Sequence, residues 1–332
     1  MWGGACHNAA MRVGILGTGS MGNVHARQYR KMPEVEIGYR DSHPERADGF
    51  RAKWEALPCA SSDELIAWAD VVDICLPTDL HLEYALKAIA AGKAVFIEKP
   101  FARDLSEGST IIEAAGKAGV PLMVGQVVRF FPEYALGHRL VQSGKIGTPA
   151  AARLRRGGKA PHGSQDWFMD HGRSGGILLD LAIHDFDWLR WTLGEVSHLY
   201  SRSVGVQSGG GPDYALTTLT FESGTVAHVE STWMDPSGFR ATYEVAGSEG
   251  MIEFDSRQSA SVRTHKKEGS KLQHPVSDTD DPYYQELSGF LGAVKNGTPI
   301  PVPGFEGLMA LNLSLAALES ARTGNVVRPT KL

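Results

Sequence analysis

The first third of the chain alternates short apolar runs with amphipathic stretches. Apolar runs typical of buried strands lie at 12–16, 35–39, 71–76, 94–97 and 121–124. Helical patterns lie between them, from the first Gly-rich turn to about Lys31 and then at 44–54, 80–91 and 105–118. Strands that alternate with helices of this length predict βαβ units and a parallel sheet.

The pattern changes after about residue 130. Strand-like segments, several of them separated by Gly-containing turns, lie at 150–155, 214–221, 225–232, 241–246, 250–254 and 259–264. A polar loop over 157–176 precedes a predicted helix over 177–193, and two helices near 282–296 and 305–323 close the chain. Strands joined by short turns predict a mainly antiparallel sheet. We therefore predict an α/β fold with two domains, over 11–129 and 130–332, and an N-terminal extension over 1–10.

Composition and charge remove several functional classes. Of the 332 residues, 42% are hydrophobic and 21% are charged, which is typical of a globular chain. A net charge of -5 disfavours a nucleic-acid partner. The longest apolar-looking run, 308–318, is too short to cross a membrane. Three cysteines cannot form a disulfide framework, and 1–10 does not resemble a secretory signal, so we expect a cytoplasmic protein.

The Gly-rich turn after the first strand is the strongest cofactor signal. Gly17, Gly19 and Gly22 form G-x-G-x-x-G around Ser20 and Met21, between a predicted strand and a predicted helix. The first glycine permits a tight turn, the second lets the backbone approach a pyrophosphate, and the third allows close helix–strand packing. The helix N-terminus adds N–H donors. The turn therefore predicts a dinucleotide site.

The residue that ends the second strand bears on the choice of dinucleotide. Asp41 lies about 20 residues beyond Gly22, where an acid binds the ribose 2′-OH. A carboxylate would repel a 2′-phosphate, so NAD is predicted and NADP is less favoured. Arg40 and Ser42 flank Asp41 and could accommodate a phosphate, and Asp41 could also be an ordinary turn residue.

Two groups of residues are candidates for catalysis. Lys99, between Glu98 and Pro100, follows a strand whose carboxyl end faces the ligand crevice of an open α/β sheet. A lysine there can donate to a substrate hydroxyl and lower its pKa, although a solvated loop lysine would give the same pattern.

The second group lies on the predicted helix over 177–193. Asp180 and His184 are four positions apart and so share one face of that helix, among apolar neighbours. Histidine suits proton transfer, and an aspartate can orient it. A structural Asp–His pair stays open. A metal site with Asp187 also stays open, although no further imidazole or cysteine spacing supports zinc.

Five segments carry the motifs of one family. They read VGILGTGSMGNVHA at 13–26, LPTDLHLEYALKAIAAGKAVFIEKPFA at 76–102, VGQVVRFFPEY at 124–134, SGGILLDLAIHDFDWLRWTLG at 174–194 and a closing helix near 304–317. The Glu-Lys-Pro signature at 98–100 combined with D-x-x-x-H at 180–184 is highly specific. Over about residues 11–330 the chain resembles the Gfo/Idh/MocA family, which includes glucose–fructose oxidoreductase and inositol 2-dehydrogenase.

The resemblance implies a Rossmann domain joined to a second α/β domain with a large open sheet, which binds substrate and forms oligomers. It implies hydride transfer between nicotinamide and a carbon that bears a hydroxyl. In that chemistry Lys99 polarises the substrate hydroxyl, His184 accepts its proton and Asp180 tunes His184. His25 also matches the family, either through packing or through cofactor contact, whereas Gln126 departs from the family pattern.

The remaining implied contacts fall into two sets. Besides the Gly-rich turn and Asp41, the implied cofactor-binding residues are Thr78, His81, Glu98 and Lys99. The implied substrate-binding residues are Lys99, Arg129, Trp167, Asp180, His184 and Tyr283. A basic segment with Arg153, Arg155, Arg156 and Lys159 could bind an anionic sugar or form salt bridges at a strand edge or subunit contact.

The predicted function is an NAD-dependent dehydrogenase. We expect it to act on a secondary alcohol of a sugar, cyclitol or sugar derivative, as a homodimer or homotetramer. An NAD-retaining glycosidase and a reductase of non-sugar substrates are alternatives within the family. A cofactor-sensing regulator without turnover is a third alternative, which the intact Lys99, Asp180 and His184 disfavour.

Overall fold

The computed structural model describes residues 10–160, 175–205, 214–258, 262–273 and 281–332, which form two compact units. The first unit combines the chain up to Phe101 with Ser106–Gly125 and Tyr283–Gly304, and the second comprises Ala102–Leu105, Gln126–Pro282 and Phe305–Leu332. The predicted second domain, 130–332, therefore includes a segment that belongs to the first unit. The reason is backbone pairing, since the Val124 N–H donates to the Val302 carbonyl at 3.1 Å.

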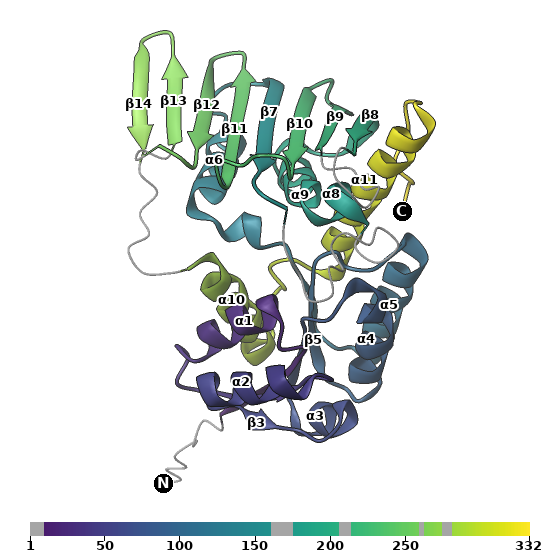
Figure 1. The fold of residues 1–332 in the computed structure, drawn as a ribbon. Coiled ribbons are helices and arrows are strands. Elements are labelled where there is room, and N and C mark those ends of the chain that lie inside the picture. The colour runs from purple at the N-terminus through teal and green to yellow at the C-terminus, as the bar shows by residue number, and fades with distance from the viewer. Residues whose placement is uncertain (1–9, 161–174, 206–213, 259–261, 274–280) are drawn as a thin grey trace. The chain divides into compact units, whose positions relative to one another are not determined.

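The first unit is built on a six-stranded parallel sheet (Figure 1). Its strands, in sheet order, are β3 (Leu57–Pro58), β2 (Val35–Arg40), β1 (Met11–Leu16), β4 (Val71–Ile74), β5 (Ala94–Glu98) and β6 (Leu122–Gly125). Its helices are α1 (Ser20–Tyr29), α2 (Pro44–Trp54), α3 (Ser62–Trp68), α4 (His81–Ala90), α5 (Leu105–Ala118) and α10 (Pro282–Asn296). The strand order reverses at β1, whose neighbours are β2 and β4, and ligands bind beyond the carboxyl ends of strands at such a point.

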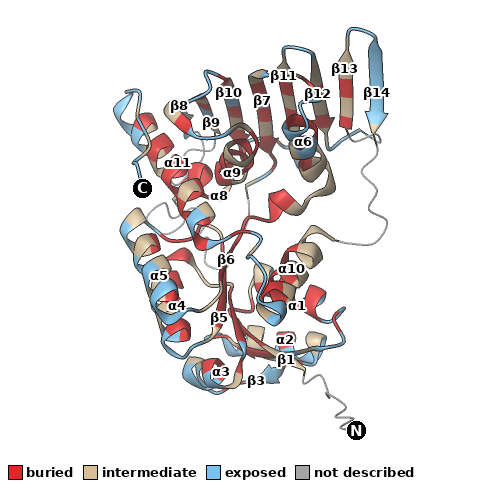
Figure 2. Ribbon diagram, turned by 180° about the vertical axis from the view of Figure 1, so that it is seen from behind, coloured by how far each residue is buried: buried red, intermediate tan, exposed pale blue. Residues whose placement is uncertain are grey.

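The apolar runs of the first third are explained by burial on both faces of this sheet. Every residue of β4, β5 and β6 is buried, and Figure 2 shows β1 and β5 as almost continuously buried. A parallel sheet covered by helices on both faces needs such runs rather than alternation. The predicted Rossmann-type sheet is confirmed.

The second unit is built on an eight-stranded sheet in which only the β7–β10 pair is parallel among the described strands. In sheet order its strands are β14 (Gly269–Gln273), β13 (Val262–Lys266), β12 (Gly250–Asp255), β11 (Arg240–Gly247), β7 (Pro149–Gly157), β10 (Val226–Thr232), β9 (Tyr214–Phe221) and β8 (Val196–Val204). Its helices are α6 (Pro132–Gln142), α8 (Gly176–Asp180), α9 (Ala182–Leu193) and α11 (Gly304–Thr323). The expected mainly antiparallel sheet is confirmed.

The strands of this sheet alternate buried and more exposed residues, which Figure 2 shows as bands on β7, β10 and β11. The buried side chains form one hydrophobic core with residues of α6, α8, α9 and α11. Helices cover one face of the sheet, as Figure 1 shows, so the alternation marks a sheet with one packed face.

Aromatic side chains fasten two of these helices to the sheet. The Trp188 ring on α9 stacks on Tyr243 of β11, with 4.8 Å between ring centroids, and its indole N–H donates to the Tyr134 carbonyl on α6. A Cβ at Gly137 would lie 2.6 Å from the Tyr243 hydroxyl oxygen, so the close approach of α6 requires glycine there. These contacts fix α9, which carries His184.

The longest described helix is not a membrane segment. α11 has 20 residues, and Asn312 at its centre bonds the backbone of Thr330 through both its amide nitrogen and its amide oxygen. Across the described ranges, no helix is long and apolar enough to cross a membrane.

Candidate active site

The three motif glycines of the β1–α1 turn play different parts. Gly17 has φ +94°, and a Cβ there would lie 2.6 Å from the Cys75 carbonyl oxygen. A Cβ at Gly22 would overlap the Gly17 carbonyl oxygen. Gly19, the N-cap of α1, differs because, apart from the glycine and its two chain neighbours, no heavy atom of the described residues lies within 4 Å of the place where its Cβ would be. Open backbone at a helix N-terminus is what a pyrophosphate needs.

Ser20 and Met21 are the first two residues of α1. Their backbone N–H groups belong to the first turn of the helix, where N–H groups have no partner within the helix. They are therefore available to the same ligand as the Gly19 backbone.

Asp41 ties the Gly-rich turn to the end of β2. One carboxylate oxygen accepts from the Thr18 N–H at 2.8 Å and from the Thr18 hydroxyl at 2.7 Å. The other accepts from the His43 N–H at 2.8 Å and from Arg46 at 3.1 Å. Burial would raise the pKa of Asp41, but the bonds from Thr18, His43 and Arg46 lower it to about 2. The group is therefore a carboxylate throughout the physiological pH range.

Thr78 and His81 lie in and after the 3-10 turn Thr78–Leu80 that follows β4, and both are buried. The His81 Nε2 lies 2.9 Å from the Leu76 carbonyl oxygen, and its Nδ1 lies 3.3 Å from that of Phe101. Burial lowers the pKa of His81, so the ring is neutral. A neutral imidazole has one N–H, so His81 donates to one of these two carbonyls, and the shorter distance favours that of Leu76 in the loop after β4.

Lys99 stands immediately beyond the carboxyl end of β5. Its backbone N–H donates to the Glu98 carboxylate at 3.1 Å, and its side chain is half-buried. The Glu98 carboxylate is buried and also lies 3.1 Å from the His25 Nε2. Glu98, which the family resemblance assigned to the cofactor, is thus engaged with neighbouring residues of the first unit.

The predicted helix over 177–193 is two helices. α8 ends at Asp180 and α9 begins at Ala182, and Leu181 between them is a turn residue with φ -107° and ψ -51°. His184 therefore lies in the first turn of α9, and its N–H lies 3.4 Å from the Leu181 carbonyl oxygen. Asp180 and His184 are half-buried rather than enclosed. Both are described within the second unit, and Lys99 within the first.

Arg129 is engaged in ion pairs rather than presented to a ligand. Its guanidinium donates to both oxygens of Asp187 at 2.7 and 2.6 Å and to Glu306 at 2.7 Å, and it lies over the Trp191 ring. The predicted substrate contact of Arg129 has no support in this geometry. The metal interpretation of His184 and Asp187 loses its support as well, because Arg129 occupies both oxygens of that carboxylate.

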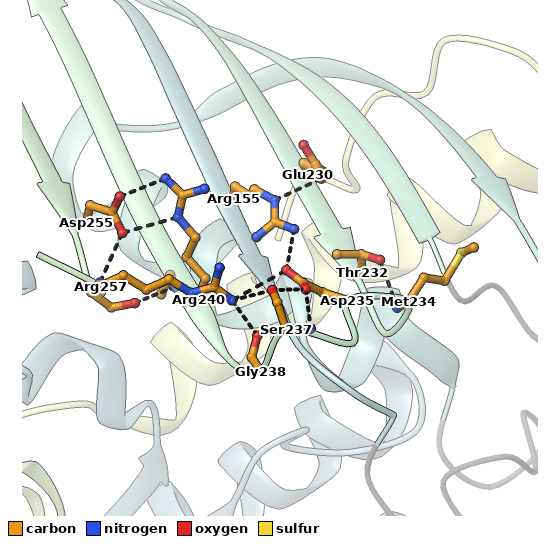
Figure 3. A network of polar contacts seen from close by, with 12 residues as sticks. Arg155, Glu230, Thr232, Met234, Asp235, Ser237, Gly238, Arg240, Asp255 and Arg257 are labelled. Carbon is orange, nitrogen blue, oxygen red and sulfur yellow. Dashed lines mark hydrogen bonds and ion pairs between the residues drawn. The ribbon is translucent and has the colours of Figure 1, made fainter.

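The basic segment of β7 is neutralised by carboxylates. Figure 3 shows Arg155 between Glu230 and Asp235, at 3.1 and 2.9 Å. Arg153 pairs with Glu244. The interpretation as an anionic-sugar site is therefore not supported, whereas salt bridges across strands account for both arginines.

Two further predicted substrate residues remain. Tyr283 is the second residue of α10, and its ring centroid lies 6.3 Å from that of His25, in the first unit. Trp167 lies outside the described residues.

Sequence reasoning missed two residues of the first unit. Thr18 anchors Asp41, and Asp73 on β4 accepts from the His25 ring at 2.8 Å. Asp73 did carry a signal, because it is a charged residue in the middle of the apolar run 71–76.

Comparison with known proteins places both units in one family. Residues 11–126 match the family model described as an oxidoreductase family with an NAD-binding Rossmann fold, and 134–253 match the GFO/IDH/MocA C-terminal domain. The chain is 33% identical to myo-inositol 2-dehydrogenase of Thermotoga maritima, over 93% of this chain and 96% of that protein. It is 31% identical to scyllo-inositol 2-dehydrogenase (NAD(+)) of Bacillus subtilis, over 96% of each. A crystal structure of a probable dehydrogenase from Thermotoga maritima superposes with a TM-score of 0.83 at 31% identity, over 96% of this chain and 99% of that one. The chain therefore belongs to the Gfo/Idh/MocA family of oxidoreductases, with an NAD-binding Rossmann fold in its first unit.

Proposed function

We propose that the protein is an NAD-dependent dehydrogenase that oxidises a secondary alcohol of a cyclitol, a sugar or a sugar derivative. The observation that carries this proposal is Lys99, held by its backbone at the carboxyl end of β5 in a sheet whose Gly-rich turn leaves room for a dinucleotide at Gly19. The two inositol dehydrogenases among its relatives support a polyol substrate.

The residues of the first unit fit NAD. The N-terminus of α1 with Gly19 suits the pyrophosphate, and the Asp41 carboxylate suits the ribose 2′-OH. The Thr78 loop, fixed by His81, follows the neighbouring strand β4 at the same edge of the sheet. When bound, NAD supplies the acceptor for the hydride.

The chain itself supplies the groups that move the proton. The Lys99 ammonium donates to the substrate hydroxyl and favours its alkoxide form. The His184 imidazole takes the proton, and Asp180 orients and tunes His184. Each of these roles is a proposal drawn from the family motif and from the position of the residue in its own unit.

A panel of polyols tests the function. Purified protein, NAD and each polyol in turn should give reduced-nicotinamide absorbance with at least one cyclitol or monosaccharide. If NAD binds but no polyol gives reduced-nicotinamide absorbance, the proposal is contradicted. That result would favour a regulator or a glycosidase that retains its cofactor.

NAD should bind about 10-fold or more tightly than NADP, because the Asp41 carboxylate opposes a 2′-phosphate. The pKa of Asp41 is lowered to about 2, so its charge is constant from about pH 5 to 8. A phosphate monoester gains its second charge near pH 6, so discrimination against NADP should grow as pH rises through about 6. Calorimetric titration of both dinucleotides measures this.

The control for this prediction is Asp41→Asn, which keeps the size of the side chain and removes its charge. The preference for NAD should shrink in this variant. Equal or tighter binding of NADP by the unmodified protein would contradict the prediction and would point to Arg40 and Ser42 as a phosphate site.

We also propose that the second unit pairs with a copy of itself through the sheet face that carries the salt bridges. A shallow hollow of about 400 Å³ on the sheet is lined by charges of both signs, among them Arg155, Glu230, Arg240 and Glu253. A surface that carries both signs can be self-complementary about a two-fold axis. Light scattering at micromolar concentration should therefore give at least twice the 35.9 kDa of one chain.

Substitution on this face tests the surface as well as the mass. Arg155→Glu should lower the mass measured by light scattering toward that of one chain. Arg12→Glu, at a residue in an exposed ion pair with Asp70, should leave the mass unchanged. A mass of one chain for the unmodified protein would refute the proposed pairing.

For the location of the protein we propose the cytoplasm, since a reducing compartment suits the Cys75 thiol beside Asp73.

A further inference from the structure

A cluster of charged side chains is buried between α1 and the sheet of the first unit. His25 on α1 and Asp73 on β4 are fully buried, and Glu98 at the end of β5 is 5% exposed. The His25 Nδ1 lies 2.8 Å from an Asp73 oxygen, and its Nε2 lies 3.1 Å from a Glu98 oxygen. One imidazole thus spans the carboxylates of two adjacent strands.

The surroundings of His25 favour its charged form. Burial alone would lower the pKa of His25, but the Asp73 carboxylate outweighs burial and holds that pKa well above its ordinary range. Other titratable groups that face this pair include Glu98, the Tyr29 hydroxyl at 3.0 Å from Asp73, Cys75 and, beside the His25 ring, Tyr283. Burial raises the pKa values of Tyr29 and Cys75, so both are neutral. An imidazolium between two carboxylates compensates charges that would be costly to bury alone.

The cluster extends to the backbone of the proposed catalytic lysine. The Glu98 oxygen that does not face His25 accepts from the Lys99 N–H at 3.1 Å. Gly125 of β6 is paired in register with Glu98, and a Cβ at Gly125 would lie 3.0 Å from the Glu98 oxygen that contacts His25. The glycine thus leaves room for the carboxylate, whose Oε1 lies within ion-pair distance of the His25 Nε2.

We propose that His25 is a positioning residue, which acts on Lys99 through the Glu98 carboxylate. This inference rests on the proposed role of Lys99. His25 links α1, which begins at the proposed dinucleotide site, with the strand end that carries the lysine. A small displacement of a catalytic group is enough to slow a reaction by about 10²-fold, so the link matters for rate as well as for folding.

Two substitutions of His25 separate its two contacts. In His25→Asn the amide nitrogen can occupy the place of Nδ1 and keep the bond to Asp73, but it cannot reach Glu98. In His25→Gln the amide nitrogen can occupy the place of Nε2 and still contact Glu98. We expect His25→Asn to lower kcat with the best polyol by about 10–100-fold with NAD affinity within about 3-fold of the unmodified protein, and His25→Gln to lower kcat less than 5-fold.

Hydrogen exchange gives a readout besides activity. The peptide containing Lys99 should exchange its amide hydrogens faster in His25→Asn than in the unmodified protein, because Glu98 no longer holds the Lys99 N–H. Tyr29→Phe is the matched control, since it removes a different bond to Asp73 and leaves Glu98 untouched. It should lower the melting temperature while kcat and exchange at Lys99 stay unchanged.

A double-substitution cycle tests the path through Glu98. Glu98→Gln keeps an oxygen that can accept from the Lys99 N–H and removes the charge, so the kcat penalty of His25→Asn should shrink at least 3-fold in that background. Equal losses of kcat in His25→Asn, His25→Gln and Tyr29→Phe, in proportion to melting temperature, would overturn the inference. Lys99→Ala is measured in parallel. If Lys99→Ala keeps full turnover, the proposed function of Lys99 is wrong. If Lys99→Ala is inactive but His25→Asn keeps full turnover, only the proposed role of His25 is wrong.

Discussion

Lys99→Ala is expected to lower turnover by about 10²–10⁴-fold, the usual worth of a positioned acid–base group, with NAD affinity nearly unchanged. Its side chain stands at the carboxyl end of β5, where the backbone N–H of Lys99 donates to Glu98, a bond that the substitution keeps. Steady-state kinetics with the polyol identified in the panel measures the loss, and calorimetry measures NAD binding.

His184→Ala should give a loss of the same order, because it removes the group that takes the proton. Asp180→Asn should lose less if Asp180 only orients and tunes His184. For alcohol oxidation kcat/KM should rise with pH, since the base must be deprotonated to accept the proton. A structural role for either residue predicts another pattern, in which melting temperature, NAD binding and activity fall together. Full turnover in either alanine variant would remove that residue from the mechanism.

Asp185→Ala is expected to destabilise the second unit by about 3–5 kcal/mol, the cost of leaving a buried charge without its partner. Arg156 on β7 and Asp185 on α9 are both buried, and the guanidinium makes three contacts to the carboxylate at 2.7–3.1 Å. The remaining contact of Arg156, to the Tyr134 hydroxyl at 2.9 Å, does not offset its charge. Urea unfolding followed by circular dichroism measures the change in the free energy of unfolding.

Two comparisons isolate the stranded charge as the cause. Removing both charges together, with Arg156→Met and Asp185→Leu, should cost much less than Asp185→Ala alone. Glu113→Ala, which breaks an exposed pair with Lys117, should change stability by only about 0.5 kcal/mol. A double variant that is as unstable as Asp185→Ala would show that lost packing, not an unpaired charge, sets the cost.

The parallel sheet was predictable because strands that are buried on both faces consist of nearly continuous apolar runs, which are visible in the sequence. The Gly-rich turn was equally visible, since positive φ at Gly17 and close packing at Gly22 permit only glycine. The break at Leu181 was not predictable, because the apolar pattern on both sides of it continues as in one helix. Helices α3 and α6 and strands β3, β8 and β14 were missed, although Ser61 before α3 and Pro132 in α6 are helix-start signals.

Site residues were predictable where they lie within a short sequence motif, but their partners from distant segments were not. Motif position assigned Arg129 to the substrate, but its carboxylate partners, Asp187 and Glu306, come from α9 and α11. Such pairings depend on the three-dimensional packing of helices and leave no local signal. The same holds for His25, whose match to the family left packing and cofactor contact equally open, while its contacts to Asp73 and Glu98 appear only once the strands are in register.

The return of Tyr283–Gly304 to the first unit has a consequence for synthesis of the chain on the ribosome. Among the described residues, the outer edge of β6 is completed by Val302 and by the bridge between Met123 and Pro303. Domains generally fold in order as they emerge, N-terminal first. Here the segment 283–304, which pairs with β6 of the N-terminal sheet, is translated after most of the second unit. The first unit can therefore be completed only after residues 126–282 of the second unit have been synthesised.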